Sequence, residues 1–383
     1  MAHLFSLLLT CTRGFESDVK AEAENVGCSA CEVIGGGVRA KGDMKTVMRL
    51  CLWSRTINKI MVEIADAYIR KENDVYELGR RLSLEPWFTA QTTFCIHAHI
   101  NDERFKNPVI LALKLKDGLV DRMRDIWGCR ASVDTQHPDI ELCLQIIQKK
   151  ARVFVELQGE PLHMRGYRRR QNLAPIRETL AASMIALSGW TPDSPFADPM
   201  CGSGTFAIEA ALRATNTAPG IQRHFAFEKL PFFASELKAD WKLLREEALE
   251  TSKNTRKRFQ GIIHASDIDR HALEIAMNNA KTAGVDKFIR FACIDVLKLE
   301  PCHGHLMMNP PYGERIRVND YALPEFYFQL GRHLRTFSGA RLTIISTPEL
   351  LKKNLHMKPD KRVSTFNGPI ACEVALYGLG GRG

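Results

Sequence analysis

The chain has 383 residues, of which 45% are hydrophobic and 25% are charged, and its formal net charge is +9 at pH 7. This length predicts two or three domains with cores of ordinary size, and the composition excludes a disordered or fibrous protein. The positive charge favours a polyanionic partner without naming one.

The cysteines and the apolar segments indicate a compartment. The 11 cysteines lack the paired spacings of a disulfide framework or a zinc site. We therefore expect free thiols in a reducing cytoplasm and no bound metal. No apolar run reaches membrane-spanning length, so we expect a cytoplasmic protein without a membrane partner.

The first residues predict a small α+β unit. An apolar stretch over residues 4–12 predicts a strand, and apolar residues at helical spacing between Phe15 and Gly27 predict a helix. The same patterns then predict two strands, a helix and a further strand, at about 31–34, 38–40, 43–53 and 59–69.

A second α+β section follows. Residues 92–100 predict a strand, and Pro108 suits the first turn of a helix that should continue to about Trp127. Strands over 140–147 and 151–157 should form a closing hairpin.

Basic residues gather on the long helix and again after the hairpin. Few acids accompany them, so an RNA-contacting surface is a serious alternative to an ordinary solvated face. Arginine interleaved with an aromatic residue also suits RNA, although an exposed linker would be equally polar. The candidate RNA-contacting residues in these two places are Lys114, Lys116, Arg165, Tyr167, Arg168 and Arg169.

From Glu178 onward, strands and helices alternate, which predicts a doubly wound parallel sheet. Residues 215–260 interrupt the alternation with a loop and an amphipathic helix. The strands are expected at about 194–198, 261–266, 288–293, 306–308, 341–346 and 371–379.

A glycine-rich turn, Asp198 to Thr205, links the first of these strands to a helix. Gly202 and Gly204 would let backbone N–H groups approach a ligand at the start of the helix, which suits a carboxylate or another anion. The turn is too short for a dinucleotide fingerprint and has no P-loop lysine, so by itself it does not identify the ligand.

Acidic residues follow the next two strands. Asp267 follows the second strand, where a carboxylate can accept both hydrogen bonds of a ribose diol. Asp295 follows the third, where it can accept from an adenine amino group beside the backbone of Val296. Asp269 is expected to cap the next helix. Since the carboxyl ends of parallel strands form one crevice, these acids and Asp198 predict a single site.

Asn309-Pro310-Pro311-Tyr312 follows the fourth strand. Consecutive prolines stiffen the turn and keep Asn309 extended. The turn would hold the side-chain oxygen of Asn309 and the carbonyl of Pro310 beside the ring of Tyr312. Such a turn could receive the exocyclic amine of a planar base.

These motifs together resemble those of class I S-adenosylmethionine-dependent amino-methyltransferases. Phe105-Lys106-Asn107 through Asp125 is similar to the THUMP RNA-binding domain, and residues 133–139 and 162–168 are similar to bacterial 23S ribosomal RNA guanine-N2 methyltransferases. The resemblance implies a Rossmann-like methyltransferase sheet preceded by α+β ferredoxin-like and THUMP domains. The implied limits are 1–44 for the ferredoxin-like segment, 45–157 for THUMP, 158–173 for a basic linker, and 174–383 for the methyltransferase domain with its helical insert at 215–260.

The resemblance also implies residue roles. S-adenosylmethionine would be the cofactor, Lys106 would join the RNA-contacting residues, and Asn309, Pro310, Pro311 and Tyr312 would receive the target amine. The implied cofactor-binding residues are Asp198, Cys201, Gly202, Gly204, Thr205, Asp267, Ile268, Asp295 and Val296.

Three functions remain open at this point. The first is methylation of a guanine N2 amine in 23S ribosomal RNA. A DNA adenine-amino methyltransferase would use the same Asn-Pro-Pro-Tyr, and a non-catalytic RNA-binding assembly factor would keep the N-terminal half. Both bases carry an exocyclic amine, so the choice of guanine rests on the resemblance.

Overall fold

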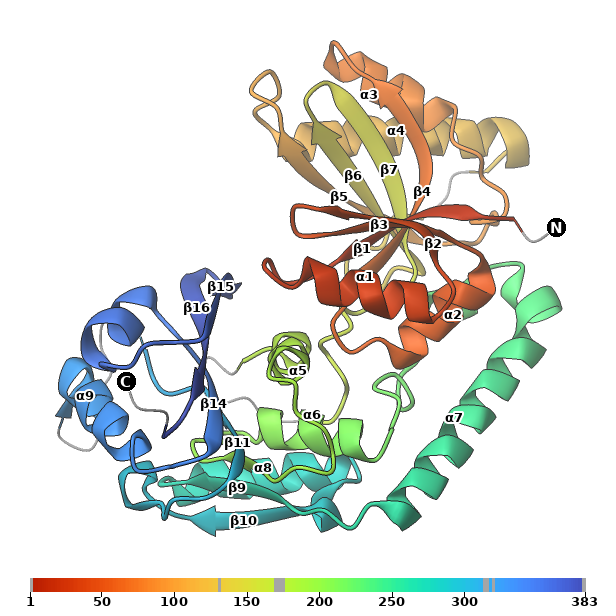
Figure 1. Ribbon diagram of the computed structural model, residues 1–383. Coiled ribbons are helices and arrows are strands. Elements are labelled where there is room, and N and C mark those ends of the chain that lie inside the picture. Colours follow the sequence, from red (N-terminus) through yellow and green to blue (C-terminus); the bar gives the residue numbers. More distant parts are fainter. Residues whose placement is uncertain (1–2, 130–131, 169–175, 313–316, 319–320, 381–383) are drawn as a thin grey trace.

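The structure is a computed structural model that describes residues 3–129, 132–168, 176–312, 317–318 and 321–380. It has an N-terminal part and a C-terminal part, each built on its own sheet (Figure 1). Within the described residues, no helix is long and apolar enough to cross a membrane.

The N-terminal part is one continuous sheet with helices on one face. In the described chain its strands lie in the order β2-β3-β1-β4-β7-β6-β5. The elements are β1 Phe5–Thr10, α1 Glu16–Asn25, β2 Ser29–Ile34, β3 Gly37–Gly42, α2 Met44–Trp53, β4 Lys59–Tyr68, α3 Glu72–Arg80, β5 Phe94–Asn101, α4 Pro108–Trp127, β6 Ile140–Ile147 and β7 Lys150–Glu156.

Strand β4 belongs to both halves of this sheet. It pairs with β1 through residues such as Ile60 and with β7 through residues such as Tyr68. The expected limit at residue 44 falls on the first residue of α2, the helix that together with β4 completes the first βαββαβ unit. The first two domains therefore share a strand rather than a linker.

Local sequence explains the helix ends in this part. The Asn107 side chain accepts from the backbone N–H groups of Val109 and Ile110, and Pro108 occupies the first turn of α4. Gly128 ends the helix in the left-handed conformation, with φ of +68°. Asp43 caps α2 by accepting from Thr46 N at 2.8 Å.

The C-terminal part is a doubly wound sheet, as predicted, with strands in the order β10-β9-β8-β11-β14-β16-β15 along the described chain. The first five are parallel, and β16 runs antiparallel to both of its neighbours. The elements are α5 Glu178–Leu187, β8 Phe196–Asp198, α6 Thr205–Ala214, α7 Lys238–Arg258, β9 Ile263–Asp267, α8 Arg270–Thr282, β10 Ile289–Cys293, β11 Gly304–Met308, β12 Arg317–Val318, β13 Tyr321–Ala322, α9 Leu323–Leu334, β14 Ala340–Ser346, β15 Lys361–Asn367 and β16 Ile370–Gly378.

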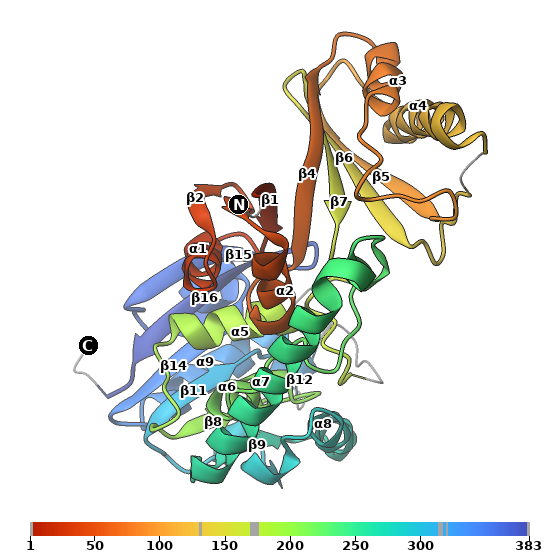
Figure 2. The same ribbon diagram turned by 90° about the vertical axis from the view of Figure 1, so that its right-hand side faces the viewer.

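The insert at residues 215–260 packs against the N-terminal part. Phe227 and Trp241 are buried in the same hydrophobic cluster as the N-terminal core. The backbone N–H groups of Gly220 and Phe227 donate to Leu52 and Leu157. Helix α7 accordingly runs along one side of the molecule toward the N-terminal part (Figure 1), the side that faces the viewer in Figure 2.

Candidate active site

The predicted site residues gather at one edge of the second sheet. Asp198 ends β8 and Asp267 ends β9, while Asp295 follows β10 and Asn309 follows β11. These four strands are neighbours and run parallel, so their carboxyl ends open onto one crevice.

A cleft at this edge combines predicted and unpredicted residues. Asp267, Ile268, Asp295 and Val296 line it. Pro199, Met200 and the buried Phe326 complete the lining. Phe326 lies on α9, more than a hundred residues after Met200, and nothing in the local sequence around it marks it as a site residue.

Asp267 holds the glycine-rich loop. One carboxylate oxygen, Oδ2, accepts from Gly202 N at 2.8 Å, and the other, Oδ1, accepts from Asp269 N at 3.0 Å. Asp269 caps α8 by accepting from His271 N, as expected. Gly204 has φ of +84°, and a Cβ there would lie 3.0 Å from the Cβ of Ala276. The loop therefore fits tightly against α8 and needs glycine at 204.

Cys201 and Thr205, which belong to the glycine-rich loop, each form a hydrogen bond with a residue outside the loop. The Cys201 backbone N–H donates to Ser266 O at 2.9 Å, and its side chain is buried. The Thr205 hydroxyl accepts from Arg168 Nη2 at 2.7 Å. These contacts thus fix the loop in place.

Asp198 is a buried acid without a well-placed partner. It is 1% exposed, and neither carboxyl oxygen has a hydrogen-bond donor in good geometry among the described residues. Burial, and secondly the charge of Asp267, raise the pKa of Asp198 well above its usual range, although the backbone amides of Ala207 and Met200 oppose the rise. A cationic ligand group would relieve this arrangement.

The Asn-Pro-Pro-Tyr turn is held from two sides. The Pro311 carbonyl accepts from the Tyr327 hydroxyl at 3.2 Å, and the Tyr312 hydroxyl accepts from Asn367 Nδ2 at 2.7 Å. Asn309 Oδ1 is buried and has no donor among the residues the structure describes. The turn therefore presents a fixed, unused acceptor beside the cleft.

A family model described as RMKL-like, methyltransferase domain, matches residues 165–375, which is more than half of the chain. The chain belongs to the RMKL-like methyltransferases. Models for the RlmL ferredoxin-like domain and the THUMP domain match residues 6–61 and 70–156 of this methyltransferase. The first match ends within β4 and the second begins after it, in agreement with the pairing of β4 to both β1 and β7.

Solved structures resemble the methyltransferase over its whole length. SMU.472, described as a candidate methyltransferase and solved with SAH, is 28% identical with a TM-score of 0.88, covering 100% of both chains. A Listeria monocytogenes protein, described as a predicted N6-adenine-specific DNA methylase, is 26% identical with a TM-score of 0.86, covering 98% of this chain and 96% of its own. TrmN from Thermus thermophilus has the same fold at 18% identity and a TM-score of 0.69, over 98% and 99% of the two chains.

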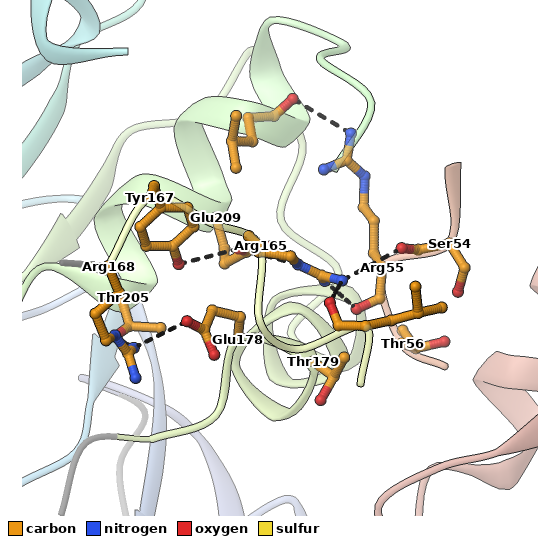
Figure 3. Close-up of polar contacts among 12 residues, drawn as sticks. Ser54, Arg55, Thr56, Arg165, Tyr167, Arg168, Glu178, Thr179, Thr205 and Glu209 are labelled. Carbon is orange, nitrogen blue, oxygen red and sulfur yellow. Dashed lines mark hydrogen bonds and ion pairs between the residues drawn. The ribbon is translucent and has the colours of Figure 1, made fainter. Parts of the chain in front are cut away.

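Three side chains in the segment expected to be an exposed basic linker are instead directed into the protein, which corrects the RNA-contacting role given to them. Figure 3 shows Arg165 directed at the backbone of Ser54 and Arg55, Tyr167 at Glu209, and Arg168 at Glu178. Arg165 and Tyr167 are 3% and 2% exposed, and the Arg168 side chain is 9% exposed. Side chains buried in this way cannot contact RNA. Arg169 lies outside the described residues.

The remaining basic candidates lie in the THUMP region of the methyltransferase. Lys106 is exposed, whereas Lys114 and Lys116 are half-buried, and Lys116 pairs with Asp117 at 2.8 Å. In the same region, Cys95, His97 and Glu141 could offer ligand atoms within 4.8 Å of one another, away from the strand ends that form the cleft.

Proposed function

We propose that the chain is an S-adenosylmethionine-dependent RNA methyltransferase that modifies the N2 amine of a guanine in 23S ribosomal RNA. The observation that supports this proposal most directly is the buried Oδ1 of Asn309, directly after β11, which has no hydrogen-bond donor among the described residues and lies at the same sheet edge as the cleft with Asp267 and Asp295. This oxygen is a ready acceptor for an amine.

The residues present fit the proposed cofactor. The buried Asp198 carboxyl, which has no donor in good geometry among the described residues, suits the ammonium of a methionine moiety. Asp267 suits a ribose diol, and Asp295 with Val296 suits an adenine. SMU.472, at 28% identity, was solved with SAH. When bound, S-adenosylmethionine supplies a methyl group on a positively charged sulfur.

The protein's own contribution is to aim the amine. A guanine amine is a weak nucleophile because its lone pair is delocalised into the ring. Acceptors at Asn309 Oδ1 and the Pro310 carbonyl would draw its N–H bonds into place and direct the lone pair at the methyl group. Orientation of this kind lowers a barrier by on the order of 7–11 kcal/mol in the best cases, and alignment of the acceptors adds electrostatic stabilisation.

RNA is the proposed bearer of the amine. The chain has a THUMP domain at residues 70–156 and a net charge of +9, which favours a polyanion. The target base must leave its stack, at a cost of about a few kcal/mol that is lowest in single-stranded or looped RNA.

The relative described as an N6-adenine-specific DNA methylase keeps a second candidate function, DNA adenine methylation, in consideration. The THUMP match favours RNA over this alternative. Parallel assays of ribosomal RNA and duplex DNA with the same enzyme separate the two candidates.

The test is Asn309→Ala with cofactor affinity and methyl transfer measured side by side. We expect transfer to fall by about 100-fold or more, with the affinity for S-adenosylmethionine nearly unchanged. Asn254→Ala on α7, whose amide contacts only the exposed Glu250 among the described residues, is the matched control and should retain full activity. Undiminished transfer by Asn309→Ala would refute the proposed role.

A further inference from the structure

The β15–β16 hairpin touches the catalytic turn at one end and the N-terminal part along its length. Asn367, the last residue of β15, donates from Nδ2 to the Tyr312 hydroxyl at 2.7 Å. Asn367 is 55 residues away in sequence from the turn that it contacts. No motif identified in the sequence includes it.

Besides this hydrogen bond, packing also restricts the Tyr312 ring. It packs against the buried cluster that contains Cys372 and Val374 of β16. Burial raises the pKa of the Tyr312 hydroxyl, so this hydroxyl stays protonated and remains a neutral hydrogen-bonding group. The amide of Asn367 therefore fixes the hydroxyl end of a ring that belongs to the Asn-Pro-Pro-Tyr turn.

Strand β15 also contacts residues near the start of the chain. The Thr365 hydroxyl, 2% exposed, donates to the Arg13 carbonyl at 2.8 Å. Gly14, with φ of +94°, lies so close to β15 that a Cβ would be 2.6 Å from Ser364 O. Phe15 is buried in the same cluster as Cys372. Both ribbon views place β15 next to α1 (Figures 1 and 2).

Thr365 and Asn367 are two positions apart on one strand, so their side chains leave the same face. The distance along the strand is about 6.6 Å. Pairing of Thr365 with Cys372 and of Asn367 with Ile370 ties both positions to β16. A shift of the Arg13–Gly14 segment would therefore be carried by a stiff hairpin to the residue that holds Tyr312.

We propose that Asn367 is a positioning residue for Tyr312, and that the Arg13–Thr365 contact couples docking of the N-terminal part to the geometry of the Asn-Pro-Pro-Tyr turn. This inference rests on the proposed function, because it assigns Tyr312 to the target base. Its consequence is that the rate of methyl transfer depends on a contact made by the N-terminal part, which does not itself line the cleft.

The test combines single and double variants. Asn367→Ala and Tyr312→Phe should each lower kcat by roughly ten-fold or more, with the affinity for cofactor and the KM for RNA within about two-fold of the wild type. The double variant should be no slower than Tyr312→Phe alone, because both changes remove the hydrogen bond between Asn367 and Tyr312, and Tyr312→Phe also removes the contact of the hydroxyl with the Cys372 thiol. Additive losses, or a loss confined to thermal stability, would overturn the positioning role.

Two matched variants of Thr365 test the proposed coupling. Thr365→Val removes the hydroxyl at nearly the same volume and should lower kcat, whereas Thr365→Ser keeps the hydroxyl and should preserve most of it. Equal rates for the two variants would overturn the coupling. Asn309→Ala serves as the reference: if it is inactive while the hairpin variants are fully active, the hairpin inference fails and the proposed function stands, whereas full activity of Asn309→Ala means that the proposed function fails.

Discussion

The Nε atom of Arg165 lies 3.5 Å from Oε1 of Glu209, and the two side chains are 2% and 0% exposed. Arg165 also donates to the carbonyl of Leu162 at 2.6 Å and to that of Arg55 in the N-terminal part. The Tyr167 hydroxyl donates to the same carboxylate oxygen of Glu209 at 3.2 Å. A buried ion pair thus joins both parts of the molecule at helix α6, which follows directly on the glycine-rich loop.

Removal of one partner from this pair should destabilise the protein strongly. Glu209→Ala would leave the Arg165 charge buried without compensation, and we expect a loss of about 3–5 kcal/mol in the free energy of unfolding. Thermal or chemical denaturation measures the change. Glu349→Ala breaks the exposed Lys353–Glu349 pair, at 2.9 Å, and should barely move the midpoint. Equal effects of the two variants would contradict the structural role of Glu209.

Asp267 should matter for the cofactor in a way that its neighbour Asp269 does not. Asp267→Ala removes the acceptor that holds Gly202 N and the carboxylate proposed to face the ribose, so the affinity for S-adenosylmethionine should fall by about ten-fold or more. Asp269→Ala removes only a helix cap, costs about 1 kcal/mol of stability and should leave the affinity unchanged. Calorimetric titration compares the two, and unchanged affinity in Asp267→Ala would reject the ribose assignment.

Cofactor binding should release a proton from Asp198. Burial raises the pKa of this carboxyl, whereas a cationic ligand group would favour its charged form, so affinity should increase as pH rises through the pKa of the free protein. Calorimetry in two buffers with different heats of ionisation measures the release. Asp198→Asn should abolish it and weaken binding, and a release that persists in this variant would point to another group.

The same carboxyl should reduce the stability of the cofactor-free protein at higher pH. Its folded pKa lies above its unfolded value, so its contribution to folding is fully present below the unfolded pKa and is lost as pH rises through the folded pKa. Asp198→Asn should therefore flatten the decline in stability toward higher pH, as denaturation measured across a pH series would show.

The lysines of the THUMP region should contribute to RNA affinity by neutralising phosphates. The double variant Lys106→Glu, Lys114→Glu should weaken RNA binding and reduce the dependence of log affinity on log salt by roughly 0.7–0.9 for each phosphate that is no longer neutralised. Lys242→Glu on α7, where the side chain is 78% exposed, is the control for the change of charge. If all three lysines contribute equally, or none does, the THUMP region is not the main RNA surface.

The gathering of four polar residues at one sheet edge could be predicted because each of them carries a local signal, whereas Phe326 of the same cleft carries none. Asp198, Asp267, Asp295 and Asn309 each follow an apolar run, and the carboxyl ends of parallel strands must meet. The cap at Asn107 and Pro108 likewise depends only on neighbouring residues, and α4 begins there as predicted.

The burial of Arg165 and Tyr167 could not be predicted because their partners are far away in sequence. Arg165 and Tyr167 stand among arginines, which are usually exposed, and their burial depends on Glu209 and on the backbone of Ser54 and Arg55. Strand β15 escapes prediction for a different reason. It lies at a sheet edge and begins with the exposed Lys361 and Arg362, so it lacks the apolar run of a central strand, although it pairs with its sequence neighbour β16.

The proposal that the protein methylates a guanine N2 amine in 23S ribosomal RNA is tested most directly by a transfer assay. The purified protein is incubated with isotopically labelled S-adenosylmethionine and 23S ribosomal RNA that lacks the modification. Mass spectrometry of the nucleosides then locates the labelled methyl group. We expect the label on N2 of a guanine at a defined position, and no label when Asn309→Ala replaces the wild type. Label on an adenine amine of DNA, or no transfer to any RNA, would contradict it.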